Sequence, residues 1–199
     1  MQQLAQLTSY ISHPLLVPNF LLYLVIFFYN PTLFGGFEAG SKYAFLGICL
    51  FITFGGPASF ILFLYLKGEI NDIYIKDRKK RKLPMILSCV CFAATAYQLE
   101  IQQFPRVICD ILWVSAIGVA ISYIINLYWK ISLHAMGISA LCSIIYFLSS
   151  SSYYNYNSLF VICVVIAGLV GSARLILNAH TLNQVLAGFF IGSLAYFFF

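Results

Sequence analysis

The chain has 199 residues, of which 62% are apolar, 18% aromatic and only 9% charged. Because soluble globular proteins carry about 25% charged residues, this composition excludes a water-soluble domain and indicates an integral membrane protein. The formal net charge of +5 does not indicate a nucleic-acid partner, because most cations lie in one short segment beside apolar runs, where anionic lipid headgroups are nearer.

The first ten residues, MQQLAQLTSY, contain no Lys or Arg and no signal-type cleavage site, so the first apolar run is expected to stay in the mature protein. A short chain of this kind favours the inner membrane of a bacterium.

Apolar runs bounded by Pro, Gly, Asn, Ser and charged residues follow one another along the whole chain. Their lengths approach the roughly 17–25 residues that cross a bilayer, and a backbone in lipid must satisfy its own hydrogen bonds, so each run is predicted to be helical. We expect an all-α fold, a polytopic transmembrane bundle of six to seven spans within one membrane-embedded domain, 1–199. The candidate spans lie at about 15–34, 43–66, 84–100, 105–127, 131–149, 157–177 and 182–199.

The cysteines fall inside apolar runs or at their ends, which predicts free, buried thiols rather than a disulfide framework. No Cys and His spacing matches a zinc site, and no metal or other cofactor is expected. The six are Cys49, Cys89, Cys91, Cys109, Cys142 and Cys163.

Each crossing of the membrane changes sides, so the loops after the second, fourth and sixth spans share one face. These loops are 67–84, the junction 128–132 that leads to His134, and the segment 172–184. When Lys76 and Arg174 are set aside as candidates for chemistry, seven cations lie on this face and two, Lys42 and Arg106, on the other. The positive-inside rule therefore places this face in the cytoplasm.

Two cations and two imidazoles, Lys76, His134, Arg174 and His180, are predicted to meet on that face. Fixed cations suit a phosphate ester, and two histidines could supply the nucleophile and the proton for the leaving oxygen. Gln184, four residues after His180, is expected on the same helix face, where its amide could hold the imidazole ring.

These residues resemble the three-part signature of the type 2 phosphatidic acid phosphatase superfamily, whose members are integral membrane lipid phosphatases. The first part is Lys, six residues, then Arg-Pro, and here Lys76 precedes Leu83-Pro84. The second part, Pro-Ser-Gly-His, corresponds to the segment from Ile131 to His134. The third part is Ser-Arg, five residues, His, three residues, Asp, and it corresponds to Ala173, Arg174, His180 and Gln184.

The resemblance implies that His180 attacks phosphorus to form a phosphohistidine, that His134 protonates the leaving oxygen, and that Lys76 and Arg174 hold the phosphoryl group. Water would then hydrolyse the phosphoenzyme without a metal. The substrates of the family are phosphorylated lipids, namely monoesters such as phosphatidic acid or diphosphates such as polyprenyl diphosphate. Ser132 matches the serine of the second part and is a further candidate for phosphate binding.

Two departures from the signature affect the chemistry. Leu83 replaces an arginine that would hold phosphate, and we expect a neighbouring cation, with Arg81 and Lys82 as candidates, to compensate. Gln184 replaces an aspartate, and an amide can fix the tautomer of His180 but cannot stabilise its positive charge. His13 precedes Pro14 at the first span and receives no role.

Two alternatives stay open. A relative that binds anionic lipid headgroups through the same cations but does not turn substrate over would share all these features. A small transporter fits less well, because the polar residues gather at one face rather than at the middle of the bilayer. The sequence leaves open whether the chain forms a homo-oligomer.

Overall fold

All seven apolar runs are helical over most of their length in the computed structural model, which describes residues 1–29, 34–71, 75, 77–151 and 156–198. No strand occurs among these residues, which confirms the all-α fold. Within them, five helical segments are long and apolar enough to cross a membrane, whereas Val17–Tyr29 and Leu182–Ser193 are shorter. The five are Ala39–Leu66, Lys79–Ile101, Arg106–Tyr128, Leu133–Ser150 and Asn157–Ile176. The six to seven predicted spans therefore comprise five of full length and two shorter apolar helices.

The helices form two compact units. Unit 1 consists of Met1–Pro31 and Lys130–Phe199, so it joins the two ends of the sequence, and unit 2 is the intervening Thr32–Trp129. The second and third parts of the signature lie in unit 1, whereas the first part lies in unit 2.

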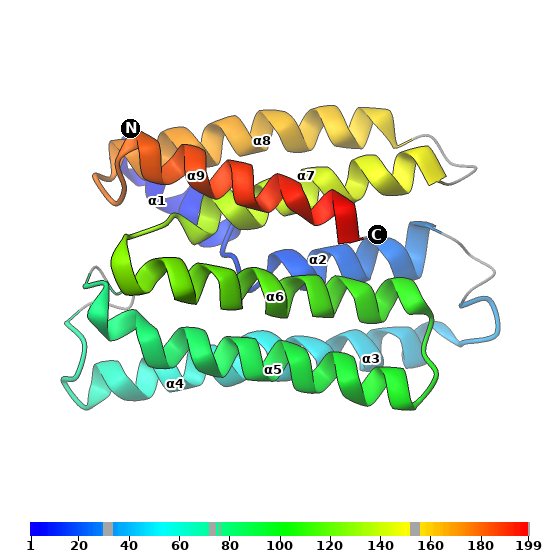
Figure 1. The fold of residues 1–199 in the computed structure, drawn as a ribbon. Coiled ribbons are helices and arrows are strands. Elements are labelled where there is room, and N and C mark those ends of the chain that lie inside the picture. Colours follow the sequence, from blue (N-terminus) through cyan, green and yellow to red (C-terminus); the bar gives the residue numbers. More distant parts are fainter. Residues whose placement is uncertain (30–33, 72–74, 76, 152–155, 199) are drawn as a thin grey trace. The chain divides into compact units, whose positions relative to one another are not determined.

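In unit 2, α3 (Ala39–Leu50), the π-helical turn η2 (Phe51–Gly55) and α4 (Gly56–Leu66) follow one another as a single helical segment (Figure 1). The wide turn has a local cause in Pro57, which has no N–H and whose ring crowds the carbonyl four residues earlier. The other two helices of the unit, α5 (Lys82–Ile101) and α6 (Arg106–Tyr128), pack along each other, and the short 3₁₀ turn η3 (Lys79–Arg81) leads into α5.

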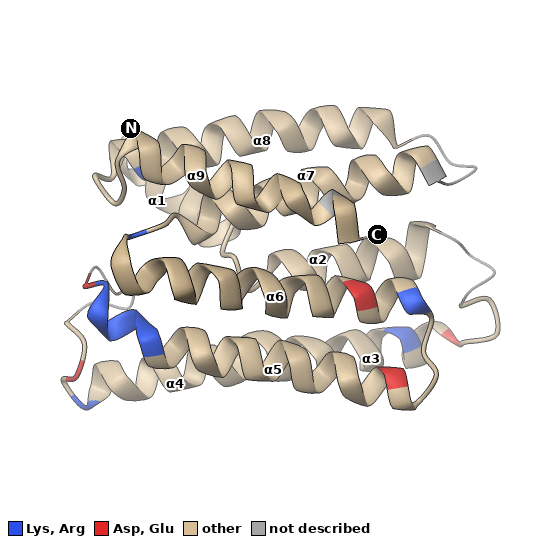
Figure 2. Ribbon diagram, in the orientation of Figure 1, with Lys and Arg blue, Asp and Glu red and all other residues tan. Residues whose placement is uncertain are grey.

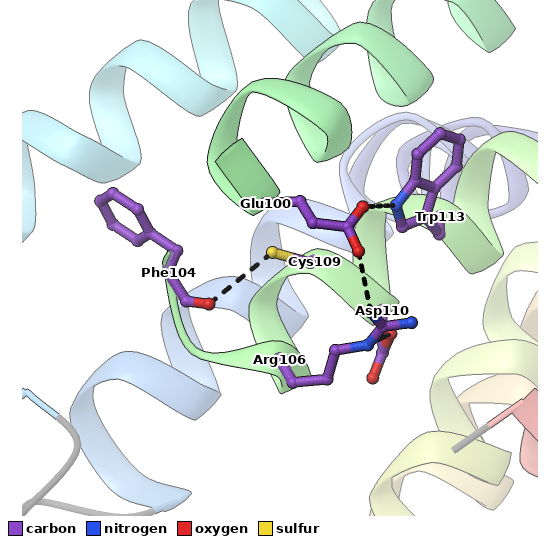
Figure 3. Close-up of polar contacts among 6 residues, drawn as sticks. All are labelled: Glu100, Phe104, Arg106, Cys109, Asp110 and Trp113. Atoms are coloured by element: carbon purple, nitrogen blue, oxygen red, sulfur yellow. Dashed lines mark hydrogen bonds and ion pairs between the residues drawn. The ribbon is translucent and has the colours of Figure 1, made fainter. Parts of the chain in front are cut away.

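The charged residues of unit 2 lie mainly near the ends of its helices (Figure 2). Between α5 and α6, Arg106 lies 2.8 Å from a carboxylate oxygen of Glu100 and 2.8 Å from one of Asp110 (Figure 3). The indole N–H of Trp113 donates to the other oxygen of Glu100 at 3.2 Å. The Arg106 side chain is 71% exposed, so this cluster lies on the surface at one end of the unit.

At the opposite end of unit 2, the basic segment before α5 makes hydrogen bonds to backbone groups. Arg78 donates to the carbonyl oxygen of Leu127 at 2.7 Å, and Asn126 donates back to the carbonyl of Arg78 at 3.0 Å. Arg81 donates to the carbonyl of Ile75 at 2.7 Å. The contacts of Arg78 attach the segment to the end of α6, where a helix exposes its unpaired carbonyls and favours positive charge.

In unit 1, α7 is the central helix and packs against α2, α8 and α9 (Figure 1). The α2 helix continues into a second π-helical turn, η1, while α9 ends in a 3₁₀ turn, η4, and a short helix, α1, packs on α8. The bounds are α1 Gln2–Ile11, α2 Val17–Leu24, η1 Val25–Tyr29, α7 Leu133–Ser151, α8 Asn157–Ile176, α9 Leu182–Ser193 and η4 Leu194–Phe198.

The close packing of α7 against α9 depends on glycine. A Cβ added to Gly188 would lie 2.6 Å from the carbonyl oxygen of Ser132, and one added to Gly192 would overlap the carbonyl of Met136. The hydroxyl of Ser139 donates across the same interface to the carbonyl of Phe189 at 2.6 Å. Small residues and hydroxyl donors of this kind hold helices together in lipid, where burial of apolar surface contributes little.

The outer faces of the helices are apolar. On α8, Val161, Val165 and Leu169 are 59%, 60% and 58% exposed, whereas Val170 and Arg174 are buried. A helix that exposes its aliphatic side chains and buries its arginine has the arrangement expected for an integral membrane protein.

Candidate functional site

The end of α8, the start of α9 and the start of α7 lie at one end of unit 1 (Figure 1). Arg174 lies in the last turn of α8, His180 lies in the α8–α9 connection, and Gln184 lies in the first turn of α9. His134 is the second residue of α7. The structure therefore brings one end of α7 and the α8–α9 connection to the same place, as the predicted sharing of one face requires.

The α8–α9 connection reverses the chain within a few residues because Asn178 adopts the left-handed conformation, with φ of 49°. Its N–H donates to the carbonyl of Leu175 at 2.9 Å, and the N–H of Ala179 donates to the carbonyl of Arg174 at 3.1 Å. These two bonds form a Schellman motif, and asparagine tolerates the left-handed position better than most residues. The turn thus constrains where the chain places His180 after Arg174.

The start of α9 is fixed by a capping box. Thr181 is the N-cap residue, its side chain accepts from the backbone N–H of Gln184, and the amide oxygen of Gln184 accepts from the N–H of Thr181 at 3.2 Å. His180 therefore precedes the helix. The expectation that His180 and Gln184 share a helix face is wrong in its reason, because the capping box and not the helical repeat brings them together.

The imidazole of His180 is held by the same amide. Its Nδ1 lies 3.1 Å from Oε1 of Gln184, and the residue is only 7% exposed. Since that oxygen already accepts the N–H of Thr181, it accepts from the ring as well, which places the imidazole proton on Nδ1. The other ring nitrogen, Nε2, then carries the lone pair that a nucleophile needs.

The backbone of the α6–α7 junction supports the α8–α9 connection. The N–H of Ser132 donates to the carbonyl of Gln184 at 3.3 Å, and the ammonium of Lys130 donates to the carbonyl of Ala179 at 2.8 Å. The hydroxyl of Ser132 accepts from the N–H of Ala135 at 3.4 Å, so it caps the start of α7. Lys130 thus lies against the residue that precedes His180.

Arg174 and His134 converge on one residue of α1. A guanidinium nitrogen of Arg174 donates to the hydroxyl of Ser9 at 3.0 Å, and Nε2 of His134 lies 3.1 Å from the carbonyl oxygen of Ser9. Ser9 is 1% exposed and Arg174 is 4% exposed, so both contacts are shielded from water. A cationic donor and an imidazole N–H therefore lie 3.0 and 3.1 Å from two oxygens of the same serine.

A third histidine completes the cluster. The ring of His13, in the connection between α1 and α2, meets the ring of His134 edge to face, with centroids 5.8 Å apart. Its Nδ1 accepts the N–H of Leu15 at 3.4 Å. Burial, and to a smaller extent the charge of Arg174, lower the pKa of His13 to about 4, so its imidazole is neutral at physiological pH.

Unit 1 contains no acidic side chain. All six Asp and Glu residues of the chain lie between Glu38 and Asp110, whereas unit 1 contains Lys130, Arg174 and all three histidines. The charge of the buried guanidinium is thus balanced by no carboxylate side chain of its own unit, and such an environment suits an anion. In the described part of the chain, no group of three His, Cys, Asp or Glu side chains could hold a metal ion.

The residues predicted for the site are distributed over both units. Unit 1 holds His180, His134, Arg174, Gln184 and Ser132. Lys76 lies outside the described residues, and Arg81 and Lys82 belong to unit 2, so their part in phosphate binding stays a prediction.

Sequence reasoning missed three residues of the site, Ser9, His13 and Lys130. Ser9 and His13 come from the opposite end of the chain and carry no motif. For Lys130, its place directly before the predicted segment from Ile131 to His134 was the available signal.

The fold and the site together define a class: an all-α protein of membrane type with a buried site of arginine and imidazole that suits an anion. Residues 127–199 match the family model described as the PAP2 superfamily. This match confirms the resemblance to the type 2 phosphatidic acid phosphatase superfamily for the part of the chain that holds α7, α8 and α9. Members of this superfamily usually hydrolyse phosphate esters, which supports a phosphatase-like function in general.

The matched segment contains the second and third parts of the signature and excludes the first. No curated protein and no solved structure matches the chain.

Proposed function

We propose that the protein is a membrane lipid phosphatase that hydrolyses a lipid phosphate monoester or diphosphate through a phosphohistidine on His180. One observation carries the proposal: donors on Arg174 and His134 converge on the two oxygens of Ser9, in a unit without acidic side chains. Groups that converge in this way can hold two oxygens of a phosphoryl group.

In the first step, Nε2 of His180 attacks phosphorus while the bond from phosphorus to the lipid oxygen breaks. The leaving oxygen takes a proton from His134, which acts as an imidazolium in the complex with the anionic substrate and is left neutral, and Arg174 stabilises the charge on the phosphoryl oxygens. The proton held on Nδ1 by Gln184 keeps the lone pair of His180 on the attacking nitrogen. The products of this step are a lipid alcohol and a phosphohistidine.

In the second step, water attacks phosphorus and gives its proton to His134, which is now neutral. The bond from phosphorus to Nε2 of His180 breaks, and inorganic phosphate leaves. Lys76, Ser132, Arg81 and Lys82 are proposed to help bind the phosphate in both steps, with Arg81 or Lys82 taking the part of the arginine that Leu83 replaces.

Gln184 favours a second candidate function, a lipid-phosphate-binding protein without turnover. An amide in place of the acidic partner of a catalytic histidine lowers the rate by about 10⁴ in serine proteases, mainly through the wrong tautomer. Here Oε1 accepts from the ring, so the tautomer is the useful one, but the charge of an imidazolium intermediate lacks a carboxylate partner. The hydrolase is preferred because this first requirement is met.

The distribution of cations supports a proposal for the location of the protein. We propose an integral protein of a bacterial inner membrane whose site faces the cytoplasm, where the basic segment before α5 also contacts anionic headgroups.

The test measures phosphate release by the purified protein in lipid vesicles that contain phosphatidic acid, phosphatidylglycerophosphate or polyprenyl diphosphate. We expect His180→Ala to abolish release and Gln184→Asp to raise the rate by restoring a carboxylate. A wild-type burst of phosphorylated protein that is labile in acid and stable in base would identify the phosphohistidine.

Arg106→Ala is the matched control, because it removes an exposed arginine from unit 2. Release by wild type that persists in His180→Ala would refute the mechanism. Release that is absent in wild type and appears in Gln184→Asp would identify the binding protein without turnover. Flux of the lipid phosphate into sealed vesicles without phosphate release would instead identify a transporter.

A further inference from the structure

The N-terminal helix α1 has no counterpart in the signature, yet it contributes the residue on which Arg174 and His134 converge. Ser9 presents its hydroxyl to the guanidinium at 3.0 Å and its carbonyl oxygen to the imidazole at 3.1 Å. Both are donors that the proposed mechanism assigns to a phosphate ester. The two oxygens of Ser9 therefore lie where two oxygens of a bound phosphoryl group would accept hydrogen bonds.

The way in which α1 is attached makes it removable. Its buried residues are Ala5 and Ser9, both small, so the contact with α8 removes little apolar surface from water. Because the stabilisation from burial scales with apolar area, at about 25 cal/mol per Å², this contact is weak compared with that of a helix that buries leucines.

The outer face of α1 combines exposed aliphatic side chains with the exposed, uncharged Gln2, Gln3 and Gln6, a mixture that fits the boundary of a lipid surface. Leu4, Leu7 and Ile11 are 70%, 55% and 71% exposed, and the helix carries no charged residue. A helix with this composition is stable at the boundary between headgroups and acyl chains. Movement of α1 away from Arg174 therefore leaves its outer face at the lipid boundary and exposes mainly the small residues of its inner face.

The strengths of the competing bonds decide the direction of the exchange. Ser9 offers a neutral hydroxyl and a neutral carbonyl, whereas a phosphate monoester offers charged oxygens. A hydrogen bond is roughly twice as strong when its donor or its acceptor is ionised. By the exchange the imidazole gains an ionised acceptor, and the guanidinium, whose bond to the hydroxyl is already charge-assisted, gains an opposite charge. A phosphate monoester at the site therefore displaces Ser9 rather than adding to it.

We propose that α1 is a reversible cover of the phosphate site, in which Ser9 holds the donors of Arg174 and His134 until a phosphate monoester replaces it. This inference rests on the proposed function for the location of the site. It adds that the empty site is closed by the protein's own N-terminal helix, so that the two donors are not left exposed to lipid or water.

The test follows the accessibility of α1 rather than turnover. Ser9→Cys is labelled with a membrane-impermeant maleimide in phosphatidylcholine vesicles, and the wild-type chain gives the background from its native thiols. We expect slow labelling of Ser9→Cys without phosphate and labelling about tenfold faster with saturating orthophosphate or with phosphatidic acid in the vesicles. Gln6→Cys, which lies on the exposed face of α1, is the matched control and should be labelled equally fast in all conditions.

The two anions distinguish the source of the phosphate. A response to phosphatidic acid and to orthophosphate indicates that the phosphate group alone displaces α1. A response to phosphatidic acid only indicates that the lipid chain is needed as well. Either response supports the cover, and vesicles of phosphatidylglycerol, a diester, should give none. Labelling of Ser9→Cys that is unchanged or slower with both anions overturns it.

Two measurements guard against a variant that misfolds. Hydrogen exchange of the wild-type chain should become faster in residues 5–11 and slower in residues 174–184 when orthophosphate binds, and slower exchange in both would overturn the cover. Ser9→Ala should bind orthophosphate about fivefold more tightly than wild type, the factor of one hydrogen bond, whereas weaker binding would make Ser9 a ligand of the phosphate.

The experiments can refute the proposed cover and the proposed hydrolysis independently of each other. Displacement of α1 by phosphate in a protein that releases none would retain the cover and refute the hydrolase. Phosphate release with α1 in place would retain the hydrolase and refute the cover.

Discussion

The two units differ in the environment of their arginines. In unit 2, Arg106 is 71% exposed and lies 2.8 Å from carboxylate oxygens of both Glu100 and Asp110. In unit 1, Arg174 is 4% exposed, and its guanidinium donates to the neutral hydroxyl of Ser9. One arginine is neutralised in water by acidic neighbours, and the other is buried in a unit without any.

The difference separates a structural arrangement of charge from a functional one. An exposed ion pair contributes little to stability, and it is tolerated because both partners stay hydrated. A buried guanidinium loses its hydration and is kept only where it performs a task. The charge distribution therefore supports, independently of the sequence signature, the proposal that the phosphate site lies in unit 1.

The largest difference between the units should come from removal of each arginine. Arg174→Ala is expected to lower the rate of phosphate release by about 10²–10³, the effect of removing one donor to a developing anion. Arg106→Ala should leave the rate unchanged, because its ion pairs lie at the end of unit 2. Equal rates for Arg174→Ala and wild type in the same vesicles would contradict this contrast.

Glycine offers the next contrast. In Gly192→Ala the new methyl group would overlap the carbonyl of Met136, so α9 must move away from α7. We expect the free energy of unfolding to fall by about 1–3 kcal/mol. Gly47→Ala in α3 meets no atom within 4 Å and should raise stability by about 0.5–1 kcal/mol. Unfolding in mixed micelles titrated with dodecyl sulfate measures both changes, and a stable Gly192→Ala protein would refute the close packing.

The third contrast depends on pH, through His13. Because the pKa of His13 is lowered from 6.5 to about 4, the unfolded chain binds a proton between these values that the folded protein does not. The stability due to neutral His13 is thus complete above pH 6.5 and is lost as the pH falls toward 4. The melting temperature of wild type should fall more steeply over this range than that of His13→Gln. Parallel curves for the two proteins would show that the pKa of His13 is unshifted.

The smallest contrast concerns two helix ends. Asn178 closes α8 and Gln103 closes α5, both in the left-handed conformation, with φ of 49° and 57°. Glycine has no Cβ penalty there, and asparagine has less than glutamine. Gln103→Gly should therefore gain about 1 kcal/mol and Asn178→Gly only a few tenths. The same unfolding assay compares them, and a larger gain at Asn178 would reverse the expectation.

The sequence predicted what depends on local pattern. Runs of apolar residues gave the helices, because lipid leaves the backbone no alternative to internal hydrogen bonds. The side of the membrane on which a loop lies follows from counting crossings, so the meeting of His134 with the α8–α9 connection was accessible. The start of α9 was accessible as well, since Thr181 and Gln184 have the spacing of a capping box before an apolar run.

The contribution of α1 to the site could not be predicted from the sequence. Ser9 and Arg174 are 165 positions apart, and serine in a short polar helix carries no signal of its destination. The exclusion of acidic residues from unit 1 is visible in the sequence only when the bounds of the unit are known, because its two segments come from opposite ends of the chain. Contacts of this range are decided by packing, which no local pattern records.

One amide oxygen both caps α9 and holds the ring of His180, so the stability of the helix start and the state of the imidazole are coupled. Oε1 of Gln184 accepts from the N–H of Thr181 at 3.2 Å and lies 3.1 Å from the imidazole of His180. Fraying of the first turn of α9 withdraws this oxygen from the helix and from the ring in the same movement. Substitutions at Leu182 or Asn183 that alter fraying should therefore tune the reactivity of the imidazole, although neither residue belongs to the proposed site.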